Sequence, residues 1–391
     1  MKLRLFTLLL LCCATPVFAA WTERYVDSAA DGAGDGTTTA TSGANGAWTL
    51  AQAANAANTS AGMRINIKKG TYANTTTTIT FSDTDATTTG PIWLRGYDTT
   101  VGDIDADPTN ALTLPSITFT TGQFAVTADC HMISGLNISG ASVTSGGQVN
   151  CNSSATDCSI SNCVITNTAA NSLSRALTMA GARCRVTKTW LSSNAAANVV
   201  LLSGVSNLAE WCHADGGLSS FAITGAGVTI QHCVSDDAAS HAITTSSAAT
   251  RIINNSIYSP AGDGLDVSAV TAETLVANNI FVNCTGTAVN SSAAATLQIY
   301  RYNNAYFGNG AVEAQIDTAE IGAVTLASDP FTNAASDDFT IVSGSLAKGA
   351  GFPPKYLNES YSSYLDIGAV QRQEAGGSNT ITPINGSIPG L

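Results

Sequence analysis

Acidic residues and a histidine gather between positions 215 and 266, in the stretches "CVSDDAASHAITTS" and "SPAGDGLDVSA" and just before them. Several carboxylates in one patch can hold one proton on and another off, as acid–base hydrolysis of a glycosidic bond requires, and a histidine can shuttle a proton. The same oxygens suit Ca²⁺, and aspartates also cap turns on solvated surfaces, so all three uses stay open. The candidate catalytic residues are Asp215, Asp236, Asp237, His241, Asp263, Asp266 and Arg251.

A second set of carboxylates alternates in "GDIDADPTN", as Asp103, Asp105 and Asp107. This pattern is that of the first half of a Ca²⁺-binding loop. The glycine and the closing glutamate of such a loop are replaced by Pro108 and Leu114. These three aspartates are the candidate metal ligands, and Ca²⁺ is the possible cofactor.

The acidic residues lie within a repeated pattern. A pair of asparagines stands before an apolar run in "RIINNSIYS", "LVANNIFVN" and "IYRYNNAYF". Eight related units follow one another at steps of 21 to 27 residues, each with a second short strand signal. Units of this length cannot bury a hydrophobic face alone, but they can when stacked. The sequence therefore predicts a solenoid of stacked coils.

Alignment of the units predicts which side chains become neighbours. An asparagine column holds Asn162, Asn255, Asn279 and Asn304, which we expect to brace a tight corner with stacked amides. His232 falls in this column, and His213 falls in the apolar column that follows it, so both are expected to be structural.

The same alignment places the acidic residues. Asp215 and Asp236 take equivalent places in adjacent coils, and so do His241 and Asp263. Asp266 alternates with apolar neighbours on a strand and should point outward.

Three pieces of the chain resemble the pectate-lyase-like superfamily. They are the opening "RYVDSAADGAGDGT…GAWTLAQAANAANTSAGMRINIKKGTY", the repeat, and the ending "ASDPFTNAASDDFTIVSGSLAKGAG…YLDIGAVQRQE". The resemblance covers roughly residues 22–374. It implies an all-β fold, a single-stranded right-handed parallel β-helix with a short N-terminal capping helix, which we expect at residues 47–58.

The resemblance carries less information about activity. Polygalacturonase-like hydrolases have Asn-Thr-Asp, Asp-Asp, Gly-His-Gly and Arg-Ile-Lys motifs. Here only Asp236-Asp237 matches, because His241 lies in Ser-His-Ala and Arg251 begins Arg-Ile-Ile. Lyases of the fold tend to use arginine or lysine as the base, often with Ca²⁺, and Arg251 and Arg175 are the basic residues that we place near the acidic patch.

The ends of the chain predict export. Residues 1–19 combine a basic start, an apolar core and a small-residue cleavage signal, which is typical of a secretory signal peptide. We expect the β-helix domain at 20–374, with a cap at 20–75 and coils at about 76–374, and a flexible tail at 375–391. The apolar run is too short to span a bilayer. The predicted location is secreted or extracellular, with the periplasm and the cell surface as alternatives.

Charge and cysteine content narrow the class of partner. The net charge is −12, so we expect no nucleic-acid partner. A polyanionic sugar would be repelled unless Ca²⁺ bridges it. Eight cysteines remain after the signal peptide; either they form disulfides, with Cys212–Cys233 and Cys158–Cys184 as candidate pairs, or they are small buried hydrophobes.

The sequence thus favours a secreted protein that binds, and could cleave, an extracellular polysaccharide along its lateral face. If it is an enzyme, we expect a polysaccharide lyase or a glycoside hydrolase. The alternative is a non-enzymatic structural or adhesive β-helix, such as a surface or virion-appendage component.

Overall fold

The structure is a computed structural model that describes residues 21–74, 77–88, 90–104, 114–142, 146–194, 196–267, 273–291, 299–314, 316, 319–351 and 366–370. The predicted signal peptide, the predicted tail at 375–391, Asp105 and Asp107 lie outside these residues.

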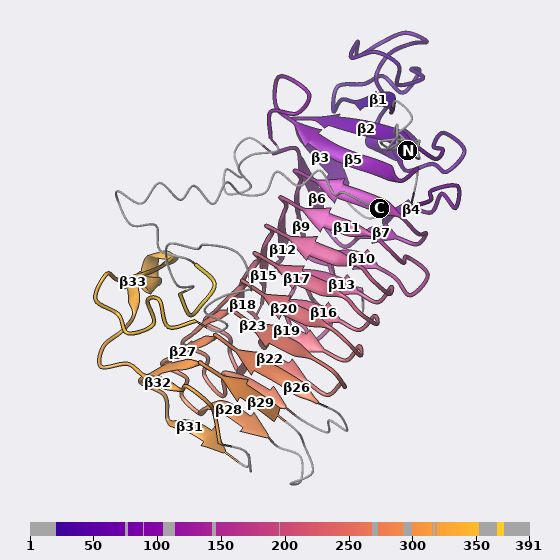
Figure 1. Cartoon of the computed structure of the whole chain (residues 1–391). Helices are drawn as coiled ribbons and strands as arrows, with labels where there is room; N and C mark the ends of the chain where they lie inside the picture. Colours follow the sequence, from indigo (N-terminus) through magenta and orange to yellow (C-terminus); the bar gives the residue numbers. More distant parts are fainter. Residues whose placement is uncertain are drawn as a thin grey trace, which may run out of the picture.

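The described chain coils into a parallel β-helix with three sheets, as predicted (Figure 1). Sheet A contains β1 (Thr22–Val26), β2 (Met63–Lys68), β5 (Ile92–Tyr97), β8 (His131–Ser134), β11 (Ser159–Ser161), β14 (Arg185–Thr187), β17 (Leu208–Glu210), β20 (Thr229–Gln231), β23 (Arg251–Ile253), β26 (Thr274–Ala277) and β29 (Ile299–Tyr302). Sheet B contains β3 (Thr71–Asn74), β6 (Ser116–Phe119), β9 (Asn137–Gly140), β12 (Val164–Asn167), β15 (Trp190–Ser193), β18 (His213–Gly216), β21 (Val234–Asp236), β24 (Ser256–Tyr258), β27 (Ile280–Val282), β30 (Ala305–Phe307) and β32 (Val324–Thr325). Sheet C contains β4 (Ile79–Phe81), β7 (Phe124–Val126), β10 (Val149–Cys151), β13 (Leu177–Met179), β16 (Val200–Leu202), β19 (Ser219–Ile223), β22 (His241–Thr245), β25 (Leu265–Val267), β28 (Thr287–Ser291) and β31 (Ala311–Ala314).

The core lies inside the coil and is built from columns of apolar side chains. Because side chains alternate across a strand, each short strand buries one or two residues against the other two sheets. On sheet B the inward column runs through Ile165, Leu191, Ala214 and Ile257, all fully buried.

This register corrects the sequence alignment at one column. His213 pairs with Trp190 and Val234, so it belongs to the outward column of sheet B and not to the core. Cys212 and Cys233 occupy the position that is the second asparagine in the coils with paired amides. The sequence alignment matches each cysteine to the residue after that asparagine, so it is shifted by one residue in these two coils.

The paired asparagines divide two tasks between them. The first of each pair, at 254, 278 and 303, adopts a left-handed backbone with φ of 51° to 56°, which asparagine tolerates well. The second forms a buried ladder. Asn279 accepts from the backbone N–H and the side-chain amide of Asn255 and donates to Asn304 and to the carbonyl oxygen of Ile252. The sequence alignment is wrong for His232 and Asn162, which belong to the left-handed column, with φ of 53° and 52°, and not to the ladder.

The ladder ends on a buried charged group at the last coils. The Glu320 carboxylate accepts from the backbone and side-chain N–H groups of Asn304 and from the Tyr306 hydroxyl. Arg301 occupies the end of the inward column of sheet A and pairs with Glu320 at 3.7 Å and with Glu313. These groups lie at the end of sheet A, which among the described residues has no strand beyond β29.

The N-terminal end is covered by a helix shorter than predicted. Helix α1 (Leu50–Ala53) starts at Thr49, whose side chain and that of Gln52 form a capping box. It ends early because the Asn55 side chain accepts from the backbone of Ala57 and starts a turn.

The described residues after 325 leave the coils and fold back onto sheet B. The segment holds β33 (Phe331–Asn333), η1 (Ala334–Ser336) and β34 (Asp338–Ile341), and β33 pairs antiparallel with β34. Residues 326–351 and 366–370 are called the C-terminal lobe below. The lobe lies beside the later coils (Figure 1). It buries a second hydrophobic cluster against the outer face of β21, β27 and β30.

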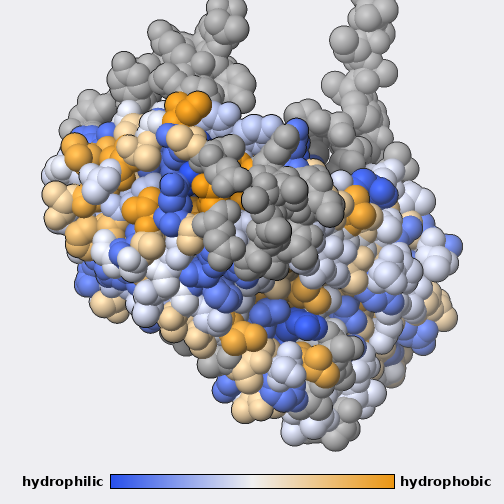
Figure 2. Space-filling model, turned by 90° about the horizontal axis from the view of Figure 1, so that it is seen from below, coloured by the Kyte–Doolittle hydropathy of each residue, from blue (hydrophilic) through white to orange (hydrophobic). Residues whose placement is uncertain are grey.

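All eight described cysteines are buried and free. The predicted pairs Cys212–Cys233 and Cys158–Cys184 are therefore not disulfides in the structure. The thiols instead donate to backbone carbonyls, as Cys212 does to Val186 and Glu210. Viewed from below in Figure 2, hydrophobic residues lie in small separate patches among hydrophilic ones.

Candidate functional site

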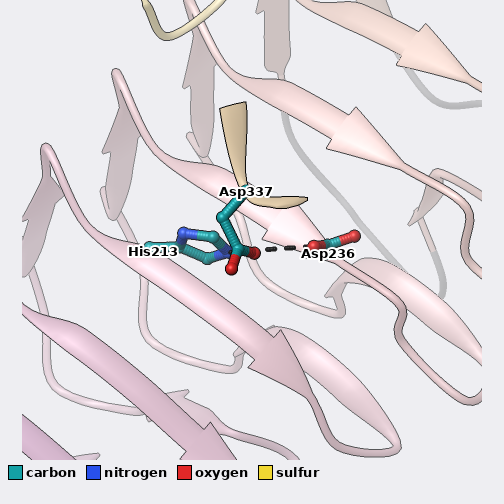
Figure 3. A group of neighbouring side chains, drawn as sticks. All are labelled: His213, Asp236 and Asp337. Carbon is teal, nitrogen blue, oxygen red and sulfur yellow. Dashed lines mark ion pairs between the residues drawn. The ribbon is translucent and has the colours of Figure 1, made fainter. Parts of the chain in front are cut away.

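A histidine and two aspartates converge where the C-terminal lobe meets sheet B. His213 opens β18 and Asp236 closes the next strand, β21, and both lie in outward columns of the sheet. Asp337 lies between η1 and β34 of the lobe, with a left-handed backbone (φ 60°). Figure 3 shows its side chain reaching from its own segment toward the other two.

The three side chains approach one another without direct hydrogen bonds. His213 Nε2 lies 4.0 Å from Asp236 Oδ2 and 3.9 Å from Asp337 Oδ1. The side chains of His213 and Asp236 are 13% and 9% exposed, whereas that of Asp337 is 52% exposed. His213 Nε2 and Asp236 Oδ1 are buried and have no hydrogen-bond partner.

Burial and like charge perturb these groups. Burial lowers the pKa of His213 to about 4, against a smaller opposing effect of Asp337, so the imidazole is neutral at pH 7. Burial, with Asp237, Asp215 and Asp337 nearby, raises the pKa of Asp236 to about 7. Burial and the same kind of repulsion also raise the pKa of Asp215. The site therefore concentrates carboxylates in a poorly solvated place.

Aromatic rings hold the histidine in position. The Trp190 ring lies 3.9 Å from the His213 ring between centroids, tilted by 40°. Phe339 of the lobe meets the same imidazole edge-on at 5.6 Å. These two contacts restrict the ring, whose Nε2 lies within 4.0 Å of both carboxyl groups.

The N-terminal part of sheet B continues this site as a stripe of outward side chains. Those of β12, β15 and β18 are half-buried. Among the described residues, the lobe reaches β18 through Asp337 and Phe339, which contact His213, and its hydrophobic cluster includes no residue of β12 or β15. The Thr166 and Ser192 hydroxyls lie 3.1 Å apart across two coils. Asp215 continues their column. We call Thr166, Trp190, Ser192, His213 and Asp215 the polar stripe.

The structure brings two predicted pairs of residues together. Asp215 and Asp236 are direct neighbours in register, and Asp237 follows at the turn with φ of 46°. The second pair lies on sheet C, where the His241 Nδ1 atom is 3.5 Å from Asp263 and accepts its backbone N–H. Asp263 also accepts from the Thr287 backbone and from Asn290, so it braces neighbouring coils.

Other predicted residues lie away from the cluster. Asp266 is on sheet C between Thr244 and Asn290. Arg251 is exposed on sheet A between Thr229 and Leu275, so it lies on a different sheet from the carboxylates of sheet B. Arg175 precedes β13 of sheet C.

Asp103 has a local structural task. Its carboxylate accepts the backbone N–H groups of Asp98, Thr99 and Thr100, which closes a turn. Its predicted co-ligands Asp105 and Asp107 lie outside the described residues.

Sequence reasoning missed two members of the cluster. The sequence alignment places His213 in the core, because it is shifted by one residue from the observed strand pairing. Asp337 lies 101 positions after Asp236, in a segment whose docking no repeat specifies. The only local signal was the acidic pair Asp337-Asp338 before Phe339.

Among the described residues, no helix is both long and apolar enough to cross a membrane. A family model described as the right handed beta helix region matches residues 177–324, which gives the coil its hand. No curated protein sequence matches the chain.

Two solved structures share the fold at low identity. A pectate lyase is 15% identical with a TM-score of 0.61, and the alignment covers 91% of this chain and 98% of the lyase. A rhamnogalacturonan lyase is 12% identical with a TM-score of 0.51, covering 76% of this chain and 86% of that one. The fold is therefore that of the pectate-lyase-like right-handed parallel β-helix.

Proposed function

We propose that this chain, a right-handed parallel β-helix, binds an extracellular polysaccharide along the polar stripe of sheet B. The observation that carries the proposal is the stripe itself. It combines an aromatic ring, hydroxyls and a carboxylate on adjacent coils, and among the described residues the hydrophobic cluster of the lobe includes no residue of β12 or β15.

The stripe offers the chemistry that a sugar chain requires. Hydroxyls and carboxylates can hydrogen-bond to sugar hydroxyls, and a tryptophan supplies a rigid apolar surface with little loss of conformational entropy. Adjacent coils repeat these groups every 4.8 Å or so, which suits an extended repeating ligand. The two structures that share the fold are a pectate lyase and a rhamnogalacturonan lyase, which supports a polysaccharide as the class of ligand.

The charge of the site favours an uncharged glycan. Asp215, Asp236, Asp237 and Asp337 surround the end of the stripe, and the whole chain has a net charge of −12. An acidic polysaccharide would be repelled unless a cation bridges it. We therefore expect binding of neutral chains without added cation, and of acidic chains only with one.

A matched pair of tryptophans tests the binding. Trp190 lies on the stripe, whereas Trp211 precedes β18 at the corner, is 45% exposed and stacks on His232. On a panel of polysaccharides, Trp190→Ala should weaken binding at least tenfold in affinity electrophoresis, and Trp211→Ala should not. Equal effects of the two substitutions would refute the stripe as the binding face.

Cleavage is the second candidate, favoured by the fold-sharing lyases. The same panel should be assayed for reducing ends and for the ultraviolet absorbance of unsaturated products. Reducing ends alone would indicate a hydrolase, and both together a lyase. Binding without either product would support the adhesive or structural alternative. We place this function outside the cell, on the export signal predicted at residues 1–19.

A further inference from the structure

We propose that His213, Asp236 and Asp337 bind one divalent cation of the zinc class, which fastens the C-terminal lobe to sheet B. The inference rests on the described cluster alone and does not depend on a polysaccharide ligand.

Two buried polar atoms of the cluster lack hydrogen-bond partners. His213 Nε2 and Asp236 Oδ1 are buried with no hydrogen bond. Such atoms are rare in folded proteins, because burying a polar atom without a hydrogen-bond partner is unfavourable. Among the described residues, His213 is the only ion-pair partner of Asp236 and of Asp337. A cation between the three side chains would give His213 Nε2, which faces Asp236 Oδ2 and Asp337 Oδ1, the partner that it lacks.

The distances between the three side chains leave room for an ion. A direct charge-assisted hydrogen bond would need about 2.7–2.9 Å, and the structure has 3.9 Å and 4.0 Å. One nitrogen and two oxygens all lie within 4.8 Å of one another. A cation between them would be at roughly 2.3–2.6 Å from each, and a small movement gives zinc distances of about 2.0–2.2 Å.

The types of ligand atom indicate which ion the cluster would bind. One imidazole nitrogen with two carboxyl oxygens suits zinc and its neighbours, whereas Ca²⁺ takes oxygen ligands. Trp190 and Phe339 already fix the imidazole, so little order would be lost on binding. The Asp337 side chain is half-exposed, so an ion at this place would keep one coordination position open to solvent.

The consequence is a cross-link between segments far apart in the chain. Asp337 comes from the lobe, whereas His213 and Asp236 come from coils of the helix. Metal binding should therefore stabilise the lobe in particular, because only the closed lobe completes the site.

The test uses the untagged chain after dialysis against a chelator. Calorimetric titration should show one Zn²⁺ per chain, and saturating Zn²⁺ should raise the thermal midpoint by about 5 °C and slow proteolysis of residues 326–351. Asp337→Asn and His213→Gln should each weaken Zn²⁺ binding at least tenfold. Asp338→Asn is the matched control, because Asp338 is adjacent and its carboxylate accepts the backbone N–H of Thr340.

Each other outcome overturns the inference. No binding up to millimolar Zn²⁺, binding of Ca²⁺ in preference to Zn²⁺, or equal loss in Asp337→Asn and Asp338→Asn would all refute it. If His213→Gln fails to fold, the Asp337 and Asp338 variants decide, since the Asp337 side chain is half-exposed. Polysaccharide binding by the unsubstituted chain is a separate readout from Zn²⁺ binding, so failure of one proposal leaves the other testable.

Discussion

Replacement of Asn279 by alanine is the sharpest test of how the coils are held together. The Asn279 side chain is fully buried and takes part in four hydrogen bonds of 2.9–3.0 Å. Alanine removes all four, and it leaves the backbone N–H of Asn255 without its acceptor. At about 1 kcal/mol for each bond, with an added cost for the orphaned groups, we expect a loss of about 3–5 kcal/mol in the free energy of unfolding.

The assay is urea unfolding followed by far-ultraviolet circular dichroism. The control is Asn254→Gly, at the first position of a neighbouring pair. Asn254 has a left-handed backbone (φ 55°) and a weak 3.4 Å contact with His232, and glycine adopts that backbone without strain. We expect the control to change stability by less than about 1 kcal/mol. A loss below about 1 kcal/mol in Asn279→Ala, or equal losses in both variants, would refute the ladder as a main source of stability.

Three further predictions concern other parts of the molecule. Burial lowers the pKa of His232 to about 4 in the folded chain, against about 6.5 in the unfolded chain. Proton uptake by the unfolded chain should therefore reduce the free energy of unfolding by up to about 3 kcal/mol as the pH falls from 6.5 to 4. Thermal midpoints across this range should fall less in His232→Asn, which restores the asparagine of neighbouring coils. Phe339 is buried against His213, Tyr258 and Phe331, so Phe339→Ala should cost the lobe about 3–5 kcal/mol and speed limited proteolysis there, while unchanged proteolysis would show that the lobe is held by other contacts. The eight buried free cysteines should resist a thiol reagent until urea unfolds the chain and then all react without reductant, and fewer than eight reactive thiols would reveal a disulfide.

The sequence predicts the solenoid well because its pattern is local and repeated. Each coil must bury the same alternate positions, so the spacing of paired asparagines and apolar residues was enough to predict stacking. The pairing of Asp215 with Asp236 follows from the same repeat, and the structure confirms it.

The cluster at His213 was harder to predict, for two physical reasons. A shift of one residue moves a strand side chain from the core to the surface, and Cys212 in place of an asparagine hid the correct alignment. Asp337 reaches the site through packing of the lobe on sheet B, where Phe331 and Phe339 bury themselves against β24. Such docking depends on the fit between surfaces and leaves no periodic signal.

The attachment points of the C-terminal lobe have a consequence for how this protein could change length in evolution. The lobe contacts coils from His213 to Asn303, through Asp337, the Ala369 bond to Ser256, the Gly368 bond to Asn278 and the Asn303 bond to Ala350. Whole coils inserted or deleted within this span would put these contacts out of register. Coils between β7 and β15 carry no such constraint from the lobe among the described residues, so relatives of different length should differ there by multiples of one coil. The described lobe contacts thus fix the number of coils between His213 and Asn303, and they set no such limit on the coils before β15.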